Sequence, residues 1–517
     1  MKHLLLALLI ASPVFGQNVV ELKLPKSNKV VVKLQFRNGS ISDPAGKEGL
    51  TELTSELITG GGTNELTFSE IQDKIFPWSA GYYALVDKEV TTFTFEVHVD
   101  FLDQFYPILK GLMLNPSFDQ KDFDRVKINQ QNYVDQVIRS SSDEEYSKKA
   151  LEDFMFRGTN YQHLKQGTSE GVKSISLEDA KNHFRNFFTR NNVTIGIAGN
   201  YSDQFLSTLK SDMMKLSDVK PALPVPAKPN QPKGIEVEIV QKDNAFGSAI
   251  FGGFPLDLTR AGDDFAALMV ANSYLGEHRK SYSKLYYLIR ETRSMNYGDY
   301  SYIEWYENGG GNMLPQSGVP RLSNYFSIWV RPVQIAKQLK QQYPELKDIE
   351  IGHAHFAFRM VLMEIDRLIK EGLTKEEFET TRDFLLSYTK LYAQSPSERL
   401  GYLLDSRFYG RKDYISELDG LLRKLTYSDV NNAIKKYWQT QNMFVTIITD
   451  KSEAEPLAES IRTNKKSPMS YSNVVKEGMP EEVLKQDEKA ASFPVNVKSV
   501  RIIDSKNTFK SNVEIAP

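Results

Sequence analysis

Two carboxylates stand four residues apart in a segment that reads as a helix. Glu52 and Glu56 lie within Gly49–Thr63, where Leu50, Leu53 and Leu57 recur at helical spacing and three glycines follow. Residues four apart share a helix face, and carboxylates suit hard cations such as Ca²⁺ or Mg²⁺. The same pair could equally form a solvated acidic face, or be neutralised by a Lys or Arg from a partner. Both readings stay open at this point.

Histidine and cysteine offer little metal chemistry elsewhere in the chain. There are seven histidines and no cysteine, which excludes disulfides, thiolate metal sites and cysteine nucleophiles. His353 and His355 form the one close pair, but residues two apart point about 200° apart on a helix and would not chelate a metal together. We therefore expect these histidines to be solvated or half-buried.

Composition excludes several other function classes. A net charge of −2 over 517 residues argues against a general nucleic-acid binder, and no apolar run after the N-terminus is long enough to span a membrane. Residues 1–16 combine a basic start, an apolar stretch over 4–11 and small residues before position 17. This pattern predicts a secretory signal peptide, and we expect an exported protein, located in a bacterial periplasm.

The remaining chain reads as two copies of one unit. A strand over 193–198, preceded by Asn191–Asn192 and by a helix N-cap at Ser176, recurs 250 residues later at 443–448 after a matching cap at Thr426. Residues 217–233 hold five prolines and predict an extended linker. We predict an α+β protein with two homologous domains, 17–216 and 234–455, each an antiparallel sheet with helices on one side. Residues 456–517 are expected to form an extended tail, with one added strand over 495–503.

At this level of detail the chain resembles the pitrilysin/insulinase-type zinc peptidases, and within them the processing-peptidase-like branch. The resemblance covers about residues 18–455. It is carried by five segments in family order: Gly49–Thr63, Pro116–Lys127, Gly167–Gly171, Asn192 with Gly199, and Ile289–Tyr297. It implies two domains that form half of a clam-shell peptidase chamber.

The resemblance also implies that the metal site is lost. Active relatives bear H-x-x-E-H, in which two histidines bind zinc and the glutamate activates water. Glu52 and Glu56 stand at the ligand positions and Ser55 at the base position. A third ligand, a glutamate, is expected near 129–133, where Asn132 and Tyr133 stand with no carboxylate. We expect no cofactor bound by this chain, and zinc in a partner subunit.

A second set of residues is retained in the other half. Active relatives carry an Arg and a Tyr seven residues apart that hold the substrate carbonyl and its developing oxyanion. Arg290 and Tyr297 stand at that spacing, with Ser294–Met295 in place of a family Gly-Leu. A glycine-rich segment further on predicts a peptide-contacting loop, whose candidate residues are Tyr302, Trp305, Tyr306, Gly309, Gly310 and Gly311.

Three functional hypotheses follow. The first is a non-catalytic subunit that pairs with an H-x-x-E-H-bearing homologue and supplies Arg290 and Tyr297 to extended or unfolded peptides. The second is a scaffold or peptide-binding protein without peptidase activity. The third, a self-sufficient peptidase, requires a site that the sequence does not reveal.

Overall fold

The computed structural model describes residues 18–278, 280–305, 314 and 316–510. The first half contains these elements: β1 (Asn18–Lys23), β2 (Lys29–Phe36), α1 (Leu50–Gly60), α2 (Phe68–Ile75), β3 (Gly81–Val86), β4 (Thr91–His98), α3 (Leu102–Leu114), α4 (Gln120–Asn132), α5 (Ile138–Ser140), α6 (Asp143–Met155), α7 (Ser169–Ser174), α8 (Leu177–Phe187), β5 (Val193–Gly199) and α9 (Asp203–Met213). A π-helical turn, Tyr133–Val137, separates α4 from α5.

The second half repeats this order and then extends it. Its elements are β6 (Ile235–Lys242), β7 (Ser248–Pro255), α10 (Phe265–Gly276), a π-helical turn (Tyr286–Glu291), β8 (Asp299–Tyr302), β9 (Tyr325–Val333), α11 (Ala336–Gln342), α12 (Ala354–Glu371), α13 (Lys375–Tyr388), α14 (Pro396–Phe408), α15 (Tyr414–Lys424), α16 (Tyr427–Tyr437), β10 (Met443–Asp450), α17 (Lys451–Arg462), α18 (Asn473–Gly478), α19 (Glu481–Ala491) and β11 (Val497–Asp504). No helix among the described residues is both long and apolar enough to cross a membrane.

Strand topology confirms the duplication. The first sheet runs β1-β5-β2-β4-β3, and the second runs β6-β10-β7-β9-β8 with β11 added beside β6. Each half therefore orders its five strands 1-5-2-4-3, and in each the first and fifth strands pair in parallel while the rest are antiparallel. The sheets are mixed and not purely antiparallel as expected, because the chain returns to the outer strand only after a helical crossover.

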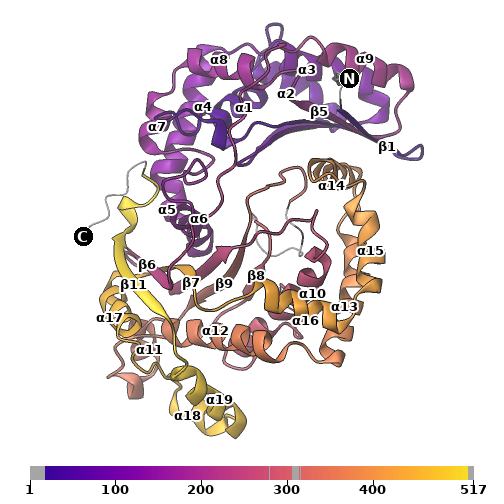
Figure 1. Cartoon of the computed structure of the whole chain (residues 1–517). Coiled ribbons are helices and arrows are strands. Elements are labelled where there is room, and N and C mark those ends of the chain that lie inside the picture. The colour runs from indigo at the N-terminus through magenta and orange to yellow at the C-terminus, as the bar shows by residue number, and fades with distance from the viewer. Residues whose placement is uncertain (1–17, 279, 306–313, 315, 511–517) are drawn as a thin grey trace, which may run out of the picture.

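Each sheet is covered on one face by helices of its own half and on the other by a helix of the opposite half. α14 packs on β1, β2 and β5 of the first sheet, where Leu400 and Leu404 bury Val31 and Ala198. In return, α6 packs on β7 and β10 of the second sheet. Figure 1 shows α6 below the first sheet and against the second, and α14 on the other side of the view, below the first sheet near β1. This exchange buries the second face of each sheet and joins the two halves.

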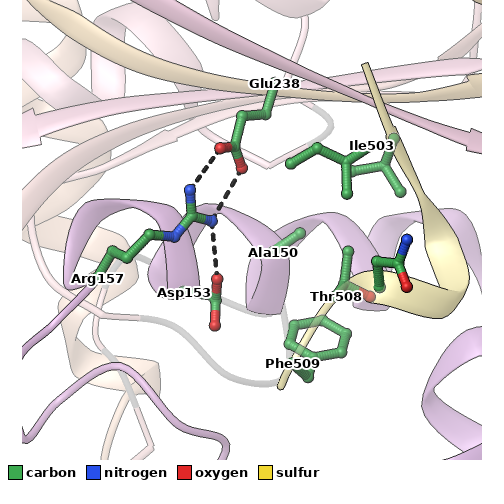
Figure 2. A pocket seen from close by; sticks show the side chains of 9 residues that line it. Ala150, Asp153, Arg157, Glu238, Ile503, Thr508 and Phe509 are labelled. Carbon is green, nitrogen blue, oxygen red and sulfur yellow. Dashed lines mark hydrogen bonds and ion pairs between the residues drawn. The ribbon is translucent and has the colours of Figure 1, made fainter. Parts of the chain in front are cut away.

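The segment after residue 455 is more ordered than the extended tail we expected. α17 and α19 pack into the core of the second half, and β11 extends its sheet in parallel beside β6, overlapping the strand predicted over 495–503. Phe509 then packs on Tyr146 of α6. Figure 2 shows this join, where Arg157 pairs with Glu238 of β6 and with Asp153 of α6 beside a cavity of only about 10 Å³. Between α9 and β6, the proline-rich residues form neither helix nor strand.

A buried ionic cluster fastens the halves together. Arg321 donates to both carboxylate oxygens of Asp87, at 2.5 and 2.6 Å, and to Glu152 of α6 at 2.6 Å. Lys88 lies 3.0 Å from the other oxygen of Glu152. All four side chains are buried, so each charge depends on the others for compensation.

Candidate functional site

α1 is fixed at its start by a glycine that no other residue could replace easily. Gly49 has a φ of 100°, and a Cβ there would lie 2.4 Å from the carbonyl oxygen of Gln166. From this point Leu50, Leu53 and Leu57 enter the core, which confirms the predicted buried face. The opposite face of α1 is thereby turned toward α4 and the loop that carries Gln166.

That face borders a pocket of about 230 Å³. Glu52 and Glu56 contribute two carboxylates, and α4 with the turn after it contributes the opposite wall. The lining residues are Glu52, Glu56, Gly60, Arg125, Val126, Asn129, Gln130, Tyr133 and Gln166. The structure therefore brings together Glu52, Glu56 and Tyr133, three of the positions singled out from sequence.

Two other predicted positions do not reach the pocket. Ser55 is fully buried and donates a 2.8 Å hydrogen bond to the carbonyl oxygen of Thr51 one helical turn earlier, so its hydroxyl is directed at its own helix. Asn132 is exposed and does not line the pocket. Its place is taken by Asn129 and Gln130, which stand on the α4 face toward α1.

Sequence reasoning also missed Arg125 and Gln166. Arg125 donates to Gly60 and to Asp122, and its guanidinium lies 5.5 Å from the ring of Phe68. Arg125 belongs to a motif that was noted for its resemblance alone. Gln166 lies next to the noted Gly167–Gly171 segment, yet nothing in the spacing of the sequence places it beside α1.

The residues present do not fit zinc. Protein zinc sites use imidazole, thiolate or carboxylate ligands, usually four in structural sites and three plus water in catalytic ones. Among the described residues, no group of three His, Cys, Asp or Glu side chains converges to hold a metal. Only two carboxylates face this pocket, and the orphaned acceptor Oε1 of the buried Gln130 is an amide oxygen. Among the described residues, the pocket beside α1 therefore offers no ligand set for zinc.

The paired histidines are structural. His353 hydrogen-bonds through both ring nitrogens, to Gln334 at 3.0 Å and to the Ser470 carbonyl at 3.1 Å. His355 contacts Ser460 at 2.9 Å. Burial lowers the pKa of His353 to about 4 and that of His355 to about 3. They are more deeply buried than we expected, and neither is available to a ligand.

Arg290 and Tyr297 are brought together in the second half. The Arg290 guanidinium lies 4.6 Å from the centre of the Tyr297 ring, and Tyr297 is 72% exposed. The turn between them is anchored by Arg293, which is buried and donates to Asp487 at 2.8 Å and to Leu288 at 2.6 Å. Neither Arg290 nor Tyr297 lines the pocket beside α1.

The aromatic run after β8 is placed differently from the sequence prediction. Tyr302 and Trp305 are buried where the two halves meet. The centre of the Trp305 ring lies 4.3 Å from the Arg321 guanidinium and 4.6 Å from the Lys149 ammonium. Because both side chains are buried between the two halves, neither forms an open peptide-contacting surface. Cation–π contacts also stabilise the Trp305 indole in this buried position. Tyr306, Gly309, Gly310 and Gly311 lie outside the described residues.

Comparison with known proteins agrees with this architecture. Residues 18–168 match the model of the insulinase family, peptidase family M16, and residues 174–328 match that of the peptidase M16 inactive domain. Together the two matches span more than half of the chain. The chain belongs to the M16 insulinase-like family.

Two M16 relatives and one solved M16 structure illustrate the range of similarity. The chain is 22% identical to the non-peptidase homolog YmxG of Helicobacter pylori, over 88% of this chain and 100% of that protein. It is also 22% identical to the uncharacterized zinc protease YmxG of Bacillus subtilis, over 57% of this chain and 70% of that protein. A crystal structure of a peptidase M16 inactive domain from Pseudomonas fluorescens superposes with a TM-score of 0.70 at 17% identity, over 84% and 96% of the two chains.

One departure from the M16 pattern has a structural explanation. Ser294, which stands where the resemblance implies a glycine, has a φ of 52°. A left-handed conformation costs a non-glycine residue roughly 1–2 kcal/mol. The turn between Arg290 and Tyr297 therefore keeps the conformation that a glycine would adopt, although the glycine itself is gone.

Proposed function

We propose that this chain is the non-catalytic subunit of an exported zinc metallopeptidase. It would pair with a homologue that bears H-x-x-E-H and present Arg290 and Tyr297 to a peptide carbonyl at the partner's metal. The observation that carries the proposal is the contrast between the two sites. The residues at the metal-ligand and base positions beside α1 do not fit zinc, whereas the Arg290 guanidinium lies 4.6 Å from the centre of the exposed Tyr297 ring.

The chemistry of that pair suits carbonyl stabilisation. A guanidinium and a phenol both donate hydrogen bonds to an oxygen that gains negative charge as a peptide bond is attacked. In this chain the pair does not line the pocket beside α1, so the carbonyl it serves would be bound at another subunit. The name of the Helicobacter pylori relative, a non-peptidase homolog, is consistent with a subunit that performs no hydrolysis alone.

Peptide binding would use the edge of the first sheet. β3 pairs on one side only, with β4, among the described strands, and α1 packs against it. An extended or unfolded peptide could add to the free edge of β3 through backbone hydrogen bonds. This would place the peptide next to α1. Export to the periplasm remains an expectation that rests on residues 1–16.

A scaffold or peptide-binding protein without any peptidase activity is the second candidate. The observation that favours it is the internal hydrogen bond of Ser55, which leaves no general base at the position where active relatives carry one. A self-sufficient peptidase is the third hypothesis, and the poor fit of the pocket to zinc counts against it.

Reconstitution separates these functions. The chain is purified alone and with an exported H-x-x-E-H-bearing homologue, and cleavage of an unfolded peptide is followed with zinc present. We expect cleavage only by the pair, with Arg290→Ala and Tyr297→Phe each lowering kcat/KM by about 10²-fold or more. Arg423→Ala, at an exposed ion pair, serves as the matched control.

Three results would redirect the proposal. Zinc-dependent cleavage by the lone chain would establish a self-sufficient peptidase. A pair that cleaves at an unchanged rate with both variants would show that Arg290 and Tyr297 do not act in trans. A pair that forms without cleaving would favour the scaffold.

A further inference from the structure

The turn between the two proposed carbonyl-binding residues is joined to a distant part of the chain by a buried arginine. Arg293 lies inside this turn and is only 4% exposed. Its guanidinium donates to the Leu288 carbonyl oxygen at 2.6 Å, to Asp487 Oδ1 at 2.8 Å and to Gln486 Oε1 at 2.9 Å. Asp487 belongs to α19, 194 residues further along the chain. The turn therefore depends on the C-terminal segment to neutralise its buried charge.

Asp487 is itself held in place. It is buried, and its second oxygen, Oδ2, accepts a 2.7 Å hydrogen bond from the Tyr471 hydroxyl. Ala490 and Ala491, near the end of the same helix, are buried in the core of the second half. Figure 1 shows α19 below α12, against which it packs, at the lower end of that half. A carboxylate bonded through both oxygens on a packed helix gives the guanidinium a fixed partner.

A second buried arginine secures the segment that carries Asp487. Arg359 of α12 is 1% exposed and donates to the carbonyl oxygens of Lys465, at 2.9 Å, and of Ala491. It also donates to the Ser467 hydroxyl at 3.0 Å. Two of these acceptors precede α18 and the third ends α19, so Arg359 fixes the segment on both sides of Asp487.

The turn has another anchor within its own half. Asn296 donates to Asp299 Oδ1 at 2.7 Å and to the Arg331 carbonyl oxygen at 3.0 Å. Between this anchor and Arg293, Ser294 adopts its left-handed conformation. Such a conformation persists only where the surrounding structure determines it. Loss of the contact with α19 should therefore release the turn.

We propose that the C-terminal segment, residues 464–491, sets the position of Arg290 and Tyr297, and that Asp487 is the positioning residue through which it acts. The inference rests on the proposed function, because it concerns the pair assigned there. Arg293 stands between these two residues in the chain. A displacement of about 1 Å in a positioned group can cost on the order of 10²-fold in rate, so a fixed turn matters for stabilising a carbonyl.

A buried ion pair with a structural role alone makes a different prediction. It would stabilise the second half as a whole, and its loss would loosen no part of that half more than another. Arg293 instead joins the π-helical turn, through Leu288, to α19, through Asp487. The two roles are therefore separated by where the chain loosens when the pair is broken.

Hydrogen exchange of the full chain, resolved to single residues by mass spectrometry, tests this first. In Asp487→Ala we expect exchange to rise about tenfold or more at the Ser294 and Met295 amides, while α12 and β9 exchange as in the parent. These amides donate to the carbonyl oxygens of Arg290, at 2.9 Å, and Ile289, at 3.2 Å.

Three variants of the same contact sharpen the test. Glu488→Ala, which removes the neighbouring carboxylate of α19 at an exposed ion pair, is the matched control and should change nothing. Asp487→Asn retains an oxygen that can accept from Arg293 and should restore most of the protection. Where Asp487→Ala fails to fold, Arg293→Lys replaces it, because lysine keeps the charge and loses the planar fork of donors.

The reconstituted pair described above gives a second readout. Asp487→Ala should lower kcat/KM about tenfold, chiefly through kcat, and should have no further effect when Arg290→Ala is already present. Leu422→Ala, at a buried position of α15 in the same half, controls for lost stability. Any effect that it has on the rate should add to that of Arg290→Ala.

The remaining outcomes are distinguishable. Unchanged exchange in the turn of Asp487→Ala overturns the inference, and so does a rise that is uniform over the second half. Faster exchange in the turn with the parent rate of cleavage overturns it as well, because the position of the turn would not matter. A pair that cleaves no peptide, while the turn alone exchanges faster in Asp487→Ala, overturns the proposed function and supports the anchoring of the turn by α19.

Discussion

α1 and α10 occupy equivalent positions in the two halves, because each is the first α-helix after two strands. They differ in what surrounds them. Aligned from their first residues, they share Leu53 and Leu268 at the fourth position, but Glu52 and Glu56 fall on Ala267 and Ala271. Every residue of α10 is buried, while α1 leaves one face to the pocket. The helix of the second half is therefore enclosed on all sides, whereas its equivalent in the first half borders a pocket.

The sharpest way to break this comparison is to exchange the residue types. Ala271→Glu places a carboxylate at a fully buried position of α10, within the apolar core of the second half. We expect a loss of at least about 3–5 kcal/mol of unfolding free energy, or failure to fold. Urea unfolding followed by circular dichroism measures it. A stable Ala271→Glu protein would show that α10 has an open face too.

A second prediction concerns the joint that fastens the two halves. Arg321→Ala leaves Asp87 and Glu152 buried without their guanidinium partner, while Lys88 and Lys149 still act on Glu152. Breaking such a buried cluster should cost about 3–5 kcal/mol, seen as a lower urea midpoint. Arg423→Ala, which breaks an exposed pair, should cost under about 1 kcal/mol. Equal effects of the two variants would mean that the buried cluster contributes no more than a surface ion pair.

A third prediction uses the end of α10, where Glu277 stands and α1 has glycines. Burial raises the pKa of Glu277 to about 7, opposed by hydrogen bonds from Ser273 and His278. Since the folded pKa lies above the unfolded value of 4.5, its stabilising contribution is complete below pH 4.5 and is lost as the pH rises through 7. Glu277→Gln should remove a slope of about 1.4 kcal/mol per pH unit in this window. Unfolding at several pH values measures the slope. An unchanged pH profile would contradict the burial effect.

The smallest expected change is at the open face itself. Glu56→Ala removes an exposed carboxylate and leaves the buried side of α1 unchanged. We expect an unfolding free energy within about 0.5 kcal/mol of the parent. Differential scanning calorimetry tests this against Leu53→Ala, which should cost about 2–5 kcal/mol. A large loss in Glu56→Ala would indicate that the carboxylate has a structural role.

Much of the fold could be predicted because its signals are local. The caps at Ser176 and Thr426 and the strand after each of them, repeated 250 residues apart as β5 and β10, are patterns of short stretches of sequence. The absence of an H-x-x-E-H motif could also be recognised from the sequence, because the motif is defined by residue types at fixed spacing within one helix. The extra helices after residue 455 were missed because their apolar stripes are short and interrupted by charge.

The pocket and the joint depend on contacts between distant segments. Sequence alone determined that Glu52 and Glu56 share one face of α1, since helical periodicity fixes that. Only the tertiary structure decided that Gln130 and Gln166 meet them, and that Ser55 and Asn132 do not. It also placed Trp305, an expected peptide contact, in the buried region where the two halves meet, next to Arg321 and Lys149. Periodicity specifies which side of an element a residue occupies, whereas packing of the two halves decides what that side contacts.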